Sequence, residues 1–214
     1  MITLYTWATP NGKKISIMLE EIGKPYRIEL VNISKDEQFL PKFLEVSPNN
    51  KIPAIVDDEV LDKNRKPLSI FESGAILTYL AEDSGKFLAP KGPERFKALE
   101  WLAWQVGGLG PILGQLGFFA VRSKEKAPLA IERFLTESDR LLSVMDTRLS
   151  ESNYLAGDNY SIADIACYPW TFAATTFLKE TLGRRIENKT AIKDWMARVA
   201  DRPAVRRGMD IPKV

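Results

Sequence analysis

The side chains best placed for chemistry include a carboxylate and a hydroxyl at the start of a predicted helix. In "FESGAIL", Glu72 and Ser73 open that helix. The unpaired N–H groups and the positive dipole of a helix N-terminus favour a carboxylate. The Ser73 hydroxyl adds a hydrogen-bond donor, and Glu72 can bind an ammonium group. The pair therefore suits the zwitterionic head of an α-amino acid, although Ser and Glu are also common at an ordinary helix start.

A second candidate is the proline in "NNKIPAIVDD", residues 49–58, which lies at the start of a predicted strand. Proline cannot donate a hydrogen bond within a sheet and is tolerated at an edge, a bulge or a first position. For an X-Pro bond the cis form costs only about 0.5–1 kcal/mol. We expect Ile52–Pro53 to be cis, with the N–H and C=O of Ile52 turned toward an extended peptide, as a strand pairs at a sheet edge. The alternative is a trans proline that only begins the strand.

The composition excludes several kinds of catalytic site. The 214 residues include no histidine and one cysteine, Cys167. The chain therefore has no histidine base, no histidine metal ligand and no cysteine pair, and any thiol–disulfide chemistry needs a thiol from a bound molecule. Cys167 lies in the most apolar predicted helix, where burial makes a thiol unreactive. We expect this cysteine to be structural.

Charge and hydropathy exclude other partners. The formal net charge is +2, which gives no electrostatic reason to expect a nucleic acid or a membrane surface. No apolar run reaches the roughly 20 residues that cross a bilayer. The start "MITLYTW" lacks the basic segment and apolar core of a signal peptide. We therefore expect a cytoplasmic protein with no metal, nucleic-acid or membrane partner.

The elements that position these residues alternate in the first part of the chain. Residue spacing predicts a strand, a helix ended by Gly23, a second strand, a short helical stretch, an antiparallel hairpin and a helix ended by Gly85. This βαβαββα order closes near residue 85. It sets Pro53 at the start of a strand and Ser73 at the start of a helix.

Long helical periods replace the strand patterns after "LAPKGPER". We expect an α/β domain at residues 1–84 and an all-helical domain at residues 92–214. "GGLGP" is predicted to break or kink one helix, and Pro203 to stop the last one. Ser161 and Asp164, in "NYSIADI", have the spacing of a capping box and predict the start of a buried helix.

Five segments together resemble the glutathione S-transferase superfamily: "TPNGKK", "SPNNKIPAIVD", "FESGAILTYLAE", "WQVGGLGPILGQ" and "NYSIADIA". The first and the fourth are most similar to the bacterial Nu class, which contains disulfide-bond reductases. The resemblance covers essentially the whole chain. It implies a thioredoxin-like N-terminal half that binds glutathione, an all-α C-terminal half that lines the second-substrate site, and a homodimer.

The resemblance assigns glutathione to the two candidate sites. The cysteinyl backbone would pair with Ile52 beside Pro53, and the γ-glutamyl head would meet Glu72 and Ser73. Gln38 would bind the glycine end. Lys51 is either at the glycine carboxylate or an ordinary solvated lysine.

Thiol activation would depend on the loop "ATPNGKK", because no Tyr, Ser or Cys follows the first strand there as in many relatives. A thiol with a pKa near 8.5 is only a few per cent thiolate at neutral pH. Lowering that pKa by about two units needs roughly 2.7 kcal/mol, which one or two hydrogen bonds to a charged sulfur can supply. Thr9 and the Asn11 amide can donate them, and the alternative is that Asn11-Gly12 is only a turn. Tyr5 is a weaker candidate because it lies inside the strand.

Arg133, in "AIERF", matches a position that contacts glutathione in Nu-class relatives. Its alternative role is an i, i+4 ion pair with Glu137. Four aromatic residues are more readily explained as core than as a substrate platform: Trp101, Trp104, Phe118 and Phe119.

The candidate residues and the family resemblance together predict a glutathione-dependent transferase and disulfide-bond reductase. One glutathione thiolate, stabilised by Thr9 and Asn11, would attack a small disulfide, and a second glutathione would resolve the product to oxidised glutathione. Weak peroxidase activity, or conjugation of an electrophile, could accompany it. The alternative is a glutathione-binding or regulatory protein of the same fold that does not turn over substrate.

Overall fold

The structure, a computed structural model, describes residues 1–213. The chain forms two compact units. Residues 1–86 and 202–213 make up the first, and residues 87–201 make up the second. Each unit is described by itself.

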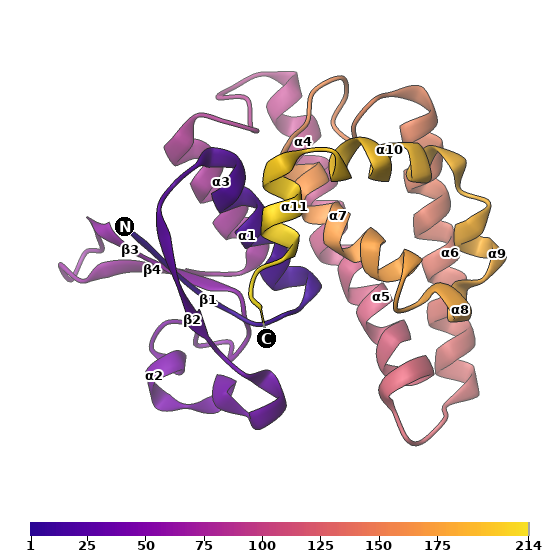
Figure 1. Cartoon of the computed structure of the whole chain (residues 1–214), viewed down its shortest axis with the longest axis horizontal. Coiled ribbons are helices and arrows are strands. Elements are labelled where there is room, and N and C mark those ends of the chain that lie inside the picture. Colours follow the sequence, from indigo (N-terminus) through magenta and orange to yellow (C-terminus); the bar gives the residue numbers. More distant parts are fainter. Residues whose placement is uncertain (214) are drawn as a thin grey trace. The chain divides into compact units, whose positions relative to one another are not determined.

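The first unit is built on a four-stranded sheet with the strand order β2-β1-β3-β4 (Figure 1). Strand β1 pairs in parallel with β2 and antiparallel with β3, and β3 pairs antiparallel with β4. The predicted βαβ unit and hairpin are therefore confirmed. The elements are β1 (Ile2–Thr6), α1 (Pro10–Ile22), β2 (Tyr26–Leu30), α2 (Pro41–Leu44), β3 (Ala54–Leu61), β4 (Pro67–Phe71), α3 (Ser73–Ser84) and α11 (Pro203–Met209).

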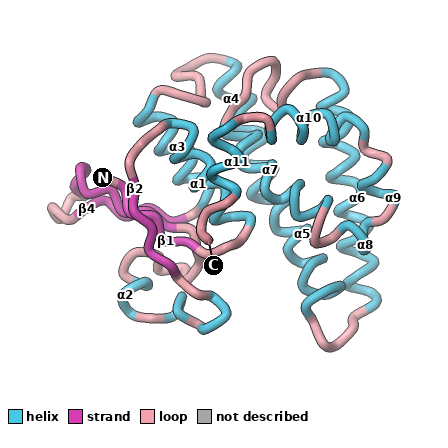
Figure 2. Tube along the Cα trace, viewed as in Figure 1, coloured by secondary structure: helices cyan, strands magenta, loops and turns pink. Residues whose placement is uncertain are grey.

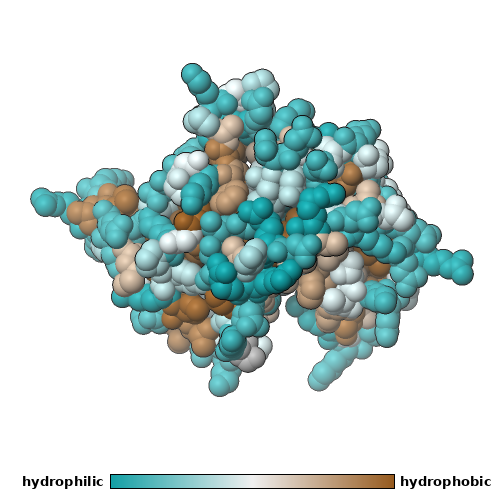
Figure 3. All heavy atoms as spheres, turned by 45° about the horizontal axis from the view of Figure 1, so that its top comes forward, coloured by the Kyte–Doolittle hydropathy of each residue, from teal (hydrophilic) through white to brown (hydrophobic). Residues whose placement is uncertain are grey.

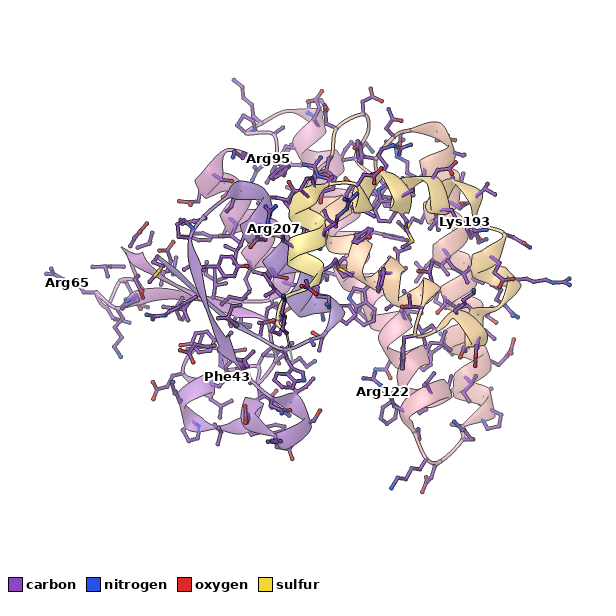
Figure 4. The ribbon with its side chains drawn as sticks, in the orientation of Figure 1. Phe43, Arg65, Arg95, Arg122, Lys193 and Arg207 are labelled. Atoms are coloured by element: carbon purple, nitrogen blue, oxygen red, sulfur yellow. The ribbon has the colours of Figure 1, made fainter. Side chains whose placement is uncertain are left out.

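Helices α1 and α3 end at the two glycines that their sequences predict. Helices α1 and α3 lie side by side (Figure 1). They end at Gly23 and Gly85, which adopt φ values of 70° and 66°, the left-handed conformation that glycine adopts without steric cost. Phe43, labelled in Figure 4, lies on α2. Its ring is 6.0 Å from that of Tyr5 in β1. It closes a small core with Val31 and Ala54.

The C-terminal segment differs from the sequence expectation. Helix α10 (Thr190–Ala200) ends before Pro203 as predicted, but it is not the last helix. Pro203 begins α11, at a position where proline is favoured because its missing N–H has no role there. Helix α11 packs on α1, and a Cβ at Gly208 would lie 2.5 Å from the Ile17 Cα. Ser16 donates a 2.7 Å hydrogen bond to the Gly208 carbonyl. The segment from residue 202, expected in the helical half, thus belongs to the first unit.

Two ion pairs hold this segment against α1. Arg202 meets Glu21 at 2.6 Å, with Glu21 almost buried. Arg207, labelled in Figure 4, meets Glu20 at 2.6 Å.

The second unit is helical, and within residues 87–201 the structure contains no strand longer than an isolated bridge (Figure 2). Its helices are α4 (Pro93–Trp104), α5 (Gly110–Gly117), α6 (Pro128–Glu151), α7 (Ile162–Thr175), α8 (Lys179–Leu182), α9 (Arg184–Glu187) and α10 (Thr190–Ala200). The predicted thioredoxin-like half and all-helical half are therefore both present.

The stretch "GGLGP" does not end its helix, so the predicted break is wrong, but the helix changes its form there. Helix α4 continues through a π-helical turn at Gln105–Leu109 into α5. The wider turn places Pro111 at the start of α5, where its missing N–H is tolerated. Gly110 and Gly114 lie against the Trp170 ring, where an added Cβ would come within 3.1 and 3.2 Å. Close packing of these glycines therefore favours the continuous helix over a break.

The buried helix α7 begins with the predicted capping box. The Asp164 carboxylate accepts hydrogen bonds from the backbone N–H groups of Leu155 and Ser161, both at 3.0 Å, and from the Trp195 indole at 2.9 Å. Burial raises the pKa of Asp164, while these hydrogen bonds act in the opposite direction. Cys167, one turn further on, is fully buried, as expected.

None of the described helices is both long and apolar enough to cross a membrane. Among residues 1–213, no three His, Cys, Asp or Glu side chains gather closely enough to hold a metal ion. The face drawn in Figure 3 is mostly hydrophilic, with apolar residues in small patches.

Candidate functional site

The register of the sheet brings the candidate ligand-binding segments to one edge, the one formed by the C-terminal ends of β1 and β4 and the N-terminal end of β3. Tyr5 pairs with Ala54, and Ala54 pairs with Phe71. Strands β1, β3 and β4 therefore reach this edge side by side, across about 10 Å at the usual strand spacing. The segments that leave it are residues 7–11 after β1, residues 51–53 before β3, and residues 72–73 after β4. This convergence makes the edge our candidate site.

Thr9 lies at the N-cap of α1. Its Oγ1 accepts a 3.2 Å hydrogen bond from the Gly12 N–H, so its hydroxyl proton remains available to another acceptor. Asn11 is in the first turn of the same helix. Gly12 has no room for a side chain, because a Cβ would lie 2.5 Å from the Trp7 carbonyl. The close approach keeps the N-terminus of α1 against the end of β1, and both candidate donors with it.

The Ile52–Pro53 bond is cis, as predicted. Pro53 is buried and Ile52 is half-buried. Within residues 1–213, neither the N–H nor the C=O of Ile52 makes a hydrogen bond. An extended peptide backbone can satisfy both groups, as in strand addition at a sheet edge. The preceding loop is held by Ser47, which donates a 2.9 Å hydrogen bond to the Lys51 carbonyl.

Glu72 and Ser73 open α3 as predicted. Glu72 has a φ of 70°, which is unfavourable for a residue with a side chain and is often seen at functional sites. Its carboxylate accepts a 3.2 Å hydrogen bond from the Asn49 amide. Ser73 is nearly buried, and its Oγ is 3.2 Å from the Lys14 ammonium. The result is a fixed carboxylate beside a helix N-terminus, which suits the ammonium and the carboxylate of an amino acid.

Gln38 and Lys51 have different environments. Gln38 follows β2 in a short 3-10 turn, Glu37–Phe39. Its Oε1 is buried and has no hydrogen-bond partner within residues 1–213, so it can accept one from a ligand. Lys51 is exposed, directly before Ile52. Its position fits either of its two predicted roles.

Arg133 lies in the second unit, on α6. It lines a cavity of about 420 Å³ together with Ile112, Leu129 and Phe134. Glu137 forms its ion pair with Arg140, at 2.6 Å, and not with Arg133 as in the alternative prediction. Arg133 is exposed. The pKa of Glu137 is lowered mainly by its hydrogen bond with Arg140, and to a smaller extent by the charges of Arg140 and Arg133.

Tyr5 is poorly suited to activate a thiol. Burial and the Glu29 carboxylate raise the pKa of its phenol. The residue lines a small cavity of about 150 Å³ with Glu29, Val31 and Phe43. Its environment is that of a core residue of β1.

Sequence reasoning missed two residues of this region. Asn49 binds Glu72, and the paired amides of "SPNN" were its available signal. Lys14 is fully buried under Ser73. The sequence pattern that could have revealed its burial is its position one turn before Met18, which places it on the apolar face of the first helix.

Comparison of the sequence with known protein families agrees with this architecture. Residues 1–82 match the family model "Glutathione S-transferase, N-terminal domain", and residues 110–203 match "Glutathione S-transferase, C-terminal domain". The chain therefore belongs to the glutathione S-transferase family. It is an α/β unit of thioredoxin type followed by a helical unit.

Among its relatives, the disulfide-bond oxidoreductase YfcG of Escherichia coli is 49% identical over 98% of this chain and 94% of its own length. The disulfide-bond oxidoreductase YghU of the same species is 38% identical over 97% of this chain and 73% of its own length.

Solved structures extend the likeness to ligand complexes. A glutathione transferase family member from Pseudomonas fluorescens, with two glutathione molecules bound, has a TM-score of 0.91 and 45% identity over 99% of this chain and 93% of that one. A glutathione transferase from Pseudomonas putida, with one glutathione disulfide bound per subunit, has a TM-score of 0.91. It is 40% identical over 99% of this chain and 91% of that one.

Proposed function

We propose that this protein is a glutathione-dependent disulfide-bond reductase. The observation that carries the proposal is the convergence at one sheet edge of the unpaired Ile52 backbone and the N-termini of α1 and α3. This edge offers a strand partner to a cysteinyl backbone, a zwitterion site at Glu72 and Ser73, and hydrogen-bond donors at Thr9 and Asn11.

The reducing thiol comes from glutathione, because the single cysteine of the chain is buried in α7. The glutathione thiolate, held by hydrogen bonds from Thr9 and Asn11, attacks one sulfur of a small disulfide. One S–S bond forms, another breaks, and one thiolate leaves. A second glutathione thiolate then attacks the mixed disulfide. Overall, two glutathione molecules become oxidised glutathione while one disulfide becomes two thiols.

The protein lowers the barrier by keeping the attacking sulfur ionised. The best attacking thiol has a pKa near the ambient pH. Hydrogen bonds to the charged sulfur of roughly 1.5–3 kcal/mol each bring a thiol from about 8.5 into this range. The N-terminal dipole of α1 favours the thiolate in the same direction.

The remaining binding roles follow from position. The buried, unpaired Oε1 of Gln38 accepts a hydrogen bond from the glycine end of glutathione, and Lys51 lies near its carboxylate. The cavity around Arg133 contributes to the site of the second glutathione or the disulfide. We place glutathione binding in residues 1–84 and second-substrate binding in residues 92–214.

The Nu class, a cytoplasmic location and a homodimer also remain proposals. The first is supported by "TPNGKK" and "WQVGGLGP". Light scattering behind size exclusion should give twice the chain mass of 24.1 kDa, and a monomer would exclude the dimer.

The test of the proposed function is turnover. Glutathione and 2-hydroxyethyl disulfide are mixed with the protein, and oxidised glutathione formation is followed through NADPH consumption by glutathione reductase. We expect a rate well above the uncatalysed background, and a loss of kcat larger than the loss of glutathione affinity for Asn11→Ala. Tight glutathione binding with no rate above background would instead favour the non-catalytic alternative.

A further inference from the structure

Lys14 is an exception to the rule that lysine lies at the surface. It is 2% exposed and is among the largest fully buried side chains of the structure. Lysine is almost never buried to this degree unless its charge has a use or a partner. Its Nζ lies 3.2 Å from the Ser73 Oγ, the hydroxyl of the first residue of α3.

The contact decides which way the Ser73 hydroxyl points. An ammonium group can only donate hydrogen bonds, so the Ser73 oxygen accepts from Lys14 and its own proton is directed to another acceptor. Ser73 also begins α3, whose first N–H groups are free of helical partners. Lys14 therefore turns Ser73 into a donor at a helix N-terminus that already favours a negative charge.

The charge of Lys14 adds to the same effect. A positive charge in a dry environment acts more strongly than one in water. It lies behind the serine hydroxyl, one hydrogen-bond length from the group that would touch a ligand.

We propose that Lys14 is a positioning residue for a carboxylate bound at Ser73, and that it makes the site specific for the carboxylate of the γ-glutamyl head. The inference rests on the proposed glutathione site. Lys14 does not touch the ligand. It acts through Ser73 and through its field, so its removal should weaken recognition of one carboxylate and leave the rest of the tripeptide unaffected.

The experiment compares two ligands on two variants. One ligand is glutathione, and the other is γ-aminobutyryl-cysteinylglycine, which keeps the amine and the thiol but lacks the γ-glutamyl carboxylate. Lys14→Met keeps the length and apolar stem of the side chain and removes the charge. Removing one member of a buried interaction can destabilise a fold, so thermal unfolding of the variant is measured beside its binding.

Lys13→Met is the matched control, because Lys13 donates instead to the Met209 carbonyl on α11. By calorimetry, Lys14→Met should raise the Kd for glutathione about tenfold, or about 1.4 kcal/mol. It should leave the Kd for the analogue unchanged. Lys13→Met should change neither value.

Equal weakening of both ligands would indicate a structural role for Lys14 and overturn the proposal, as would no change for either. If Lys14→Met does not fold, Lys14→Gln, which keeps a donor without the charge, should show the same preferential loss for glutathione. Failure of the wild-type protein to bind glutathione would refute the proposed function itself, which separates the two conclusions.

Discussion

Replacing Thr9 with valine should raise the pKa of the bound glutathione thiol by about one to two units. The Thr9 oxygen already accepts the Gly12 N–H at 3.2 Å, so its proton is available to the sulfur. Valine keeps the shape and removes the hydroxyl. A hydrogen bond to a charged group contributes roughly 1.5–3 kcal/mol, and about 1.4 kcal/mol corresponds to one pKa unit.

The pH dependence of disulfide reduction measures this shift. Because a higher thiol pKa leaves less thiolate at neutral pH, a rise of the thiol pKa from about 6.5 to about 7.5–8.5 should lower kcat/KM for 2-hydroxyethyl disulfide at pH 7 by about three- to twenty-fivefold. Above the raised pKa the thiol is ionised in both proteins, so the two rates should converge. The ultraviolet absorbance of the thiolate, followed against pH, gives the same pKa without turnover.

Thr9→Ser, which keeps the hydroxyl, is the control and should retain the wild-type pH profile. Loss of the N-cap in Thr9→Val should also cost about 1 kcal/mol of folding free energy, and thermal unfolding measures that separately. If Thr9→Val binds glutathione with the wild-type thiol pKa, Thr9 is not the donor and the reasoning fails.

Other predictions concern stability. Gly208→Ala should destabilise the first unit and expose residues 202–213 to proteolysis, because the new Cβ would lie 2.5 Å from the Ile17 Cα; unchanged unfolding and protease resistance would contradict this. Asp164→Ala should cost more than about 3 kcal/mol in denaturant unfolding, because it leaves the Leu155 N–H and the Trp195 indole without their buried acceptor. Asp57→Asn tests a pH effect. Burial raises the pKa of Asp57, but the Glu59 N–H, the Tyr79 hydroxyl and Lys24 lower it, with a net decrease. A lowered folded-state pKa gives stability that is present above the unfolded value, near 3.9, and is lost as pH falls through the folded value. The variant should therefore lose less folding stability than the wild type as the pH is lowered. An identical loss of stability in both proteins would show that Asp57 does not contribute to it.

Short sequence patterns were sufficient to predict most helices and strands of the first unit. Gly23 and Gly85 end helices because only glycine adopts their conformation easily, and Pro53 begins a strand after a cis bond. The positions of Glu72 and Ser73 at the start of α3 follow from the same kind of signal. Such features depend on a few neighbouring residues.

The sequence analysis missed features that depend on packing between residues far apart in the chain. Pro203 follows the end of α10 as predicted, but the sequence analysis missed that it also begins α11, a helix that packs on α1. "GGLGP" stays helical because Gly110 and Gly114 pack on Trp170, a contact that no local pattern reveals. Lys14 was missed because a lysine counts as a surface residue in any periodicity, whereas its burial depends on α3.

The position of α11 has a consequence for biosynthesis. The helix that covers α1 is encoded more than a hundred residues after the last strand of the sheet it serves, which ends at Phe71. While the ribosome is still making the helical unit, the emerging α/β part lacks this cover, and Ile17 and its neighbours are open to water. We expect that part to mature only after residues 202–209 have left the exit tunnel.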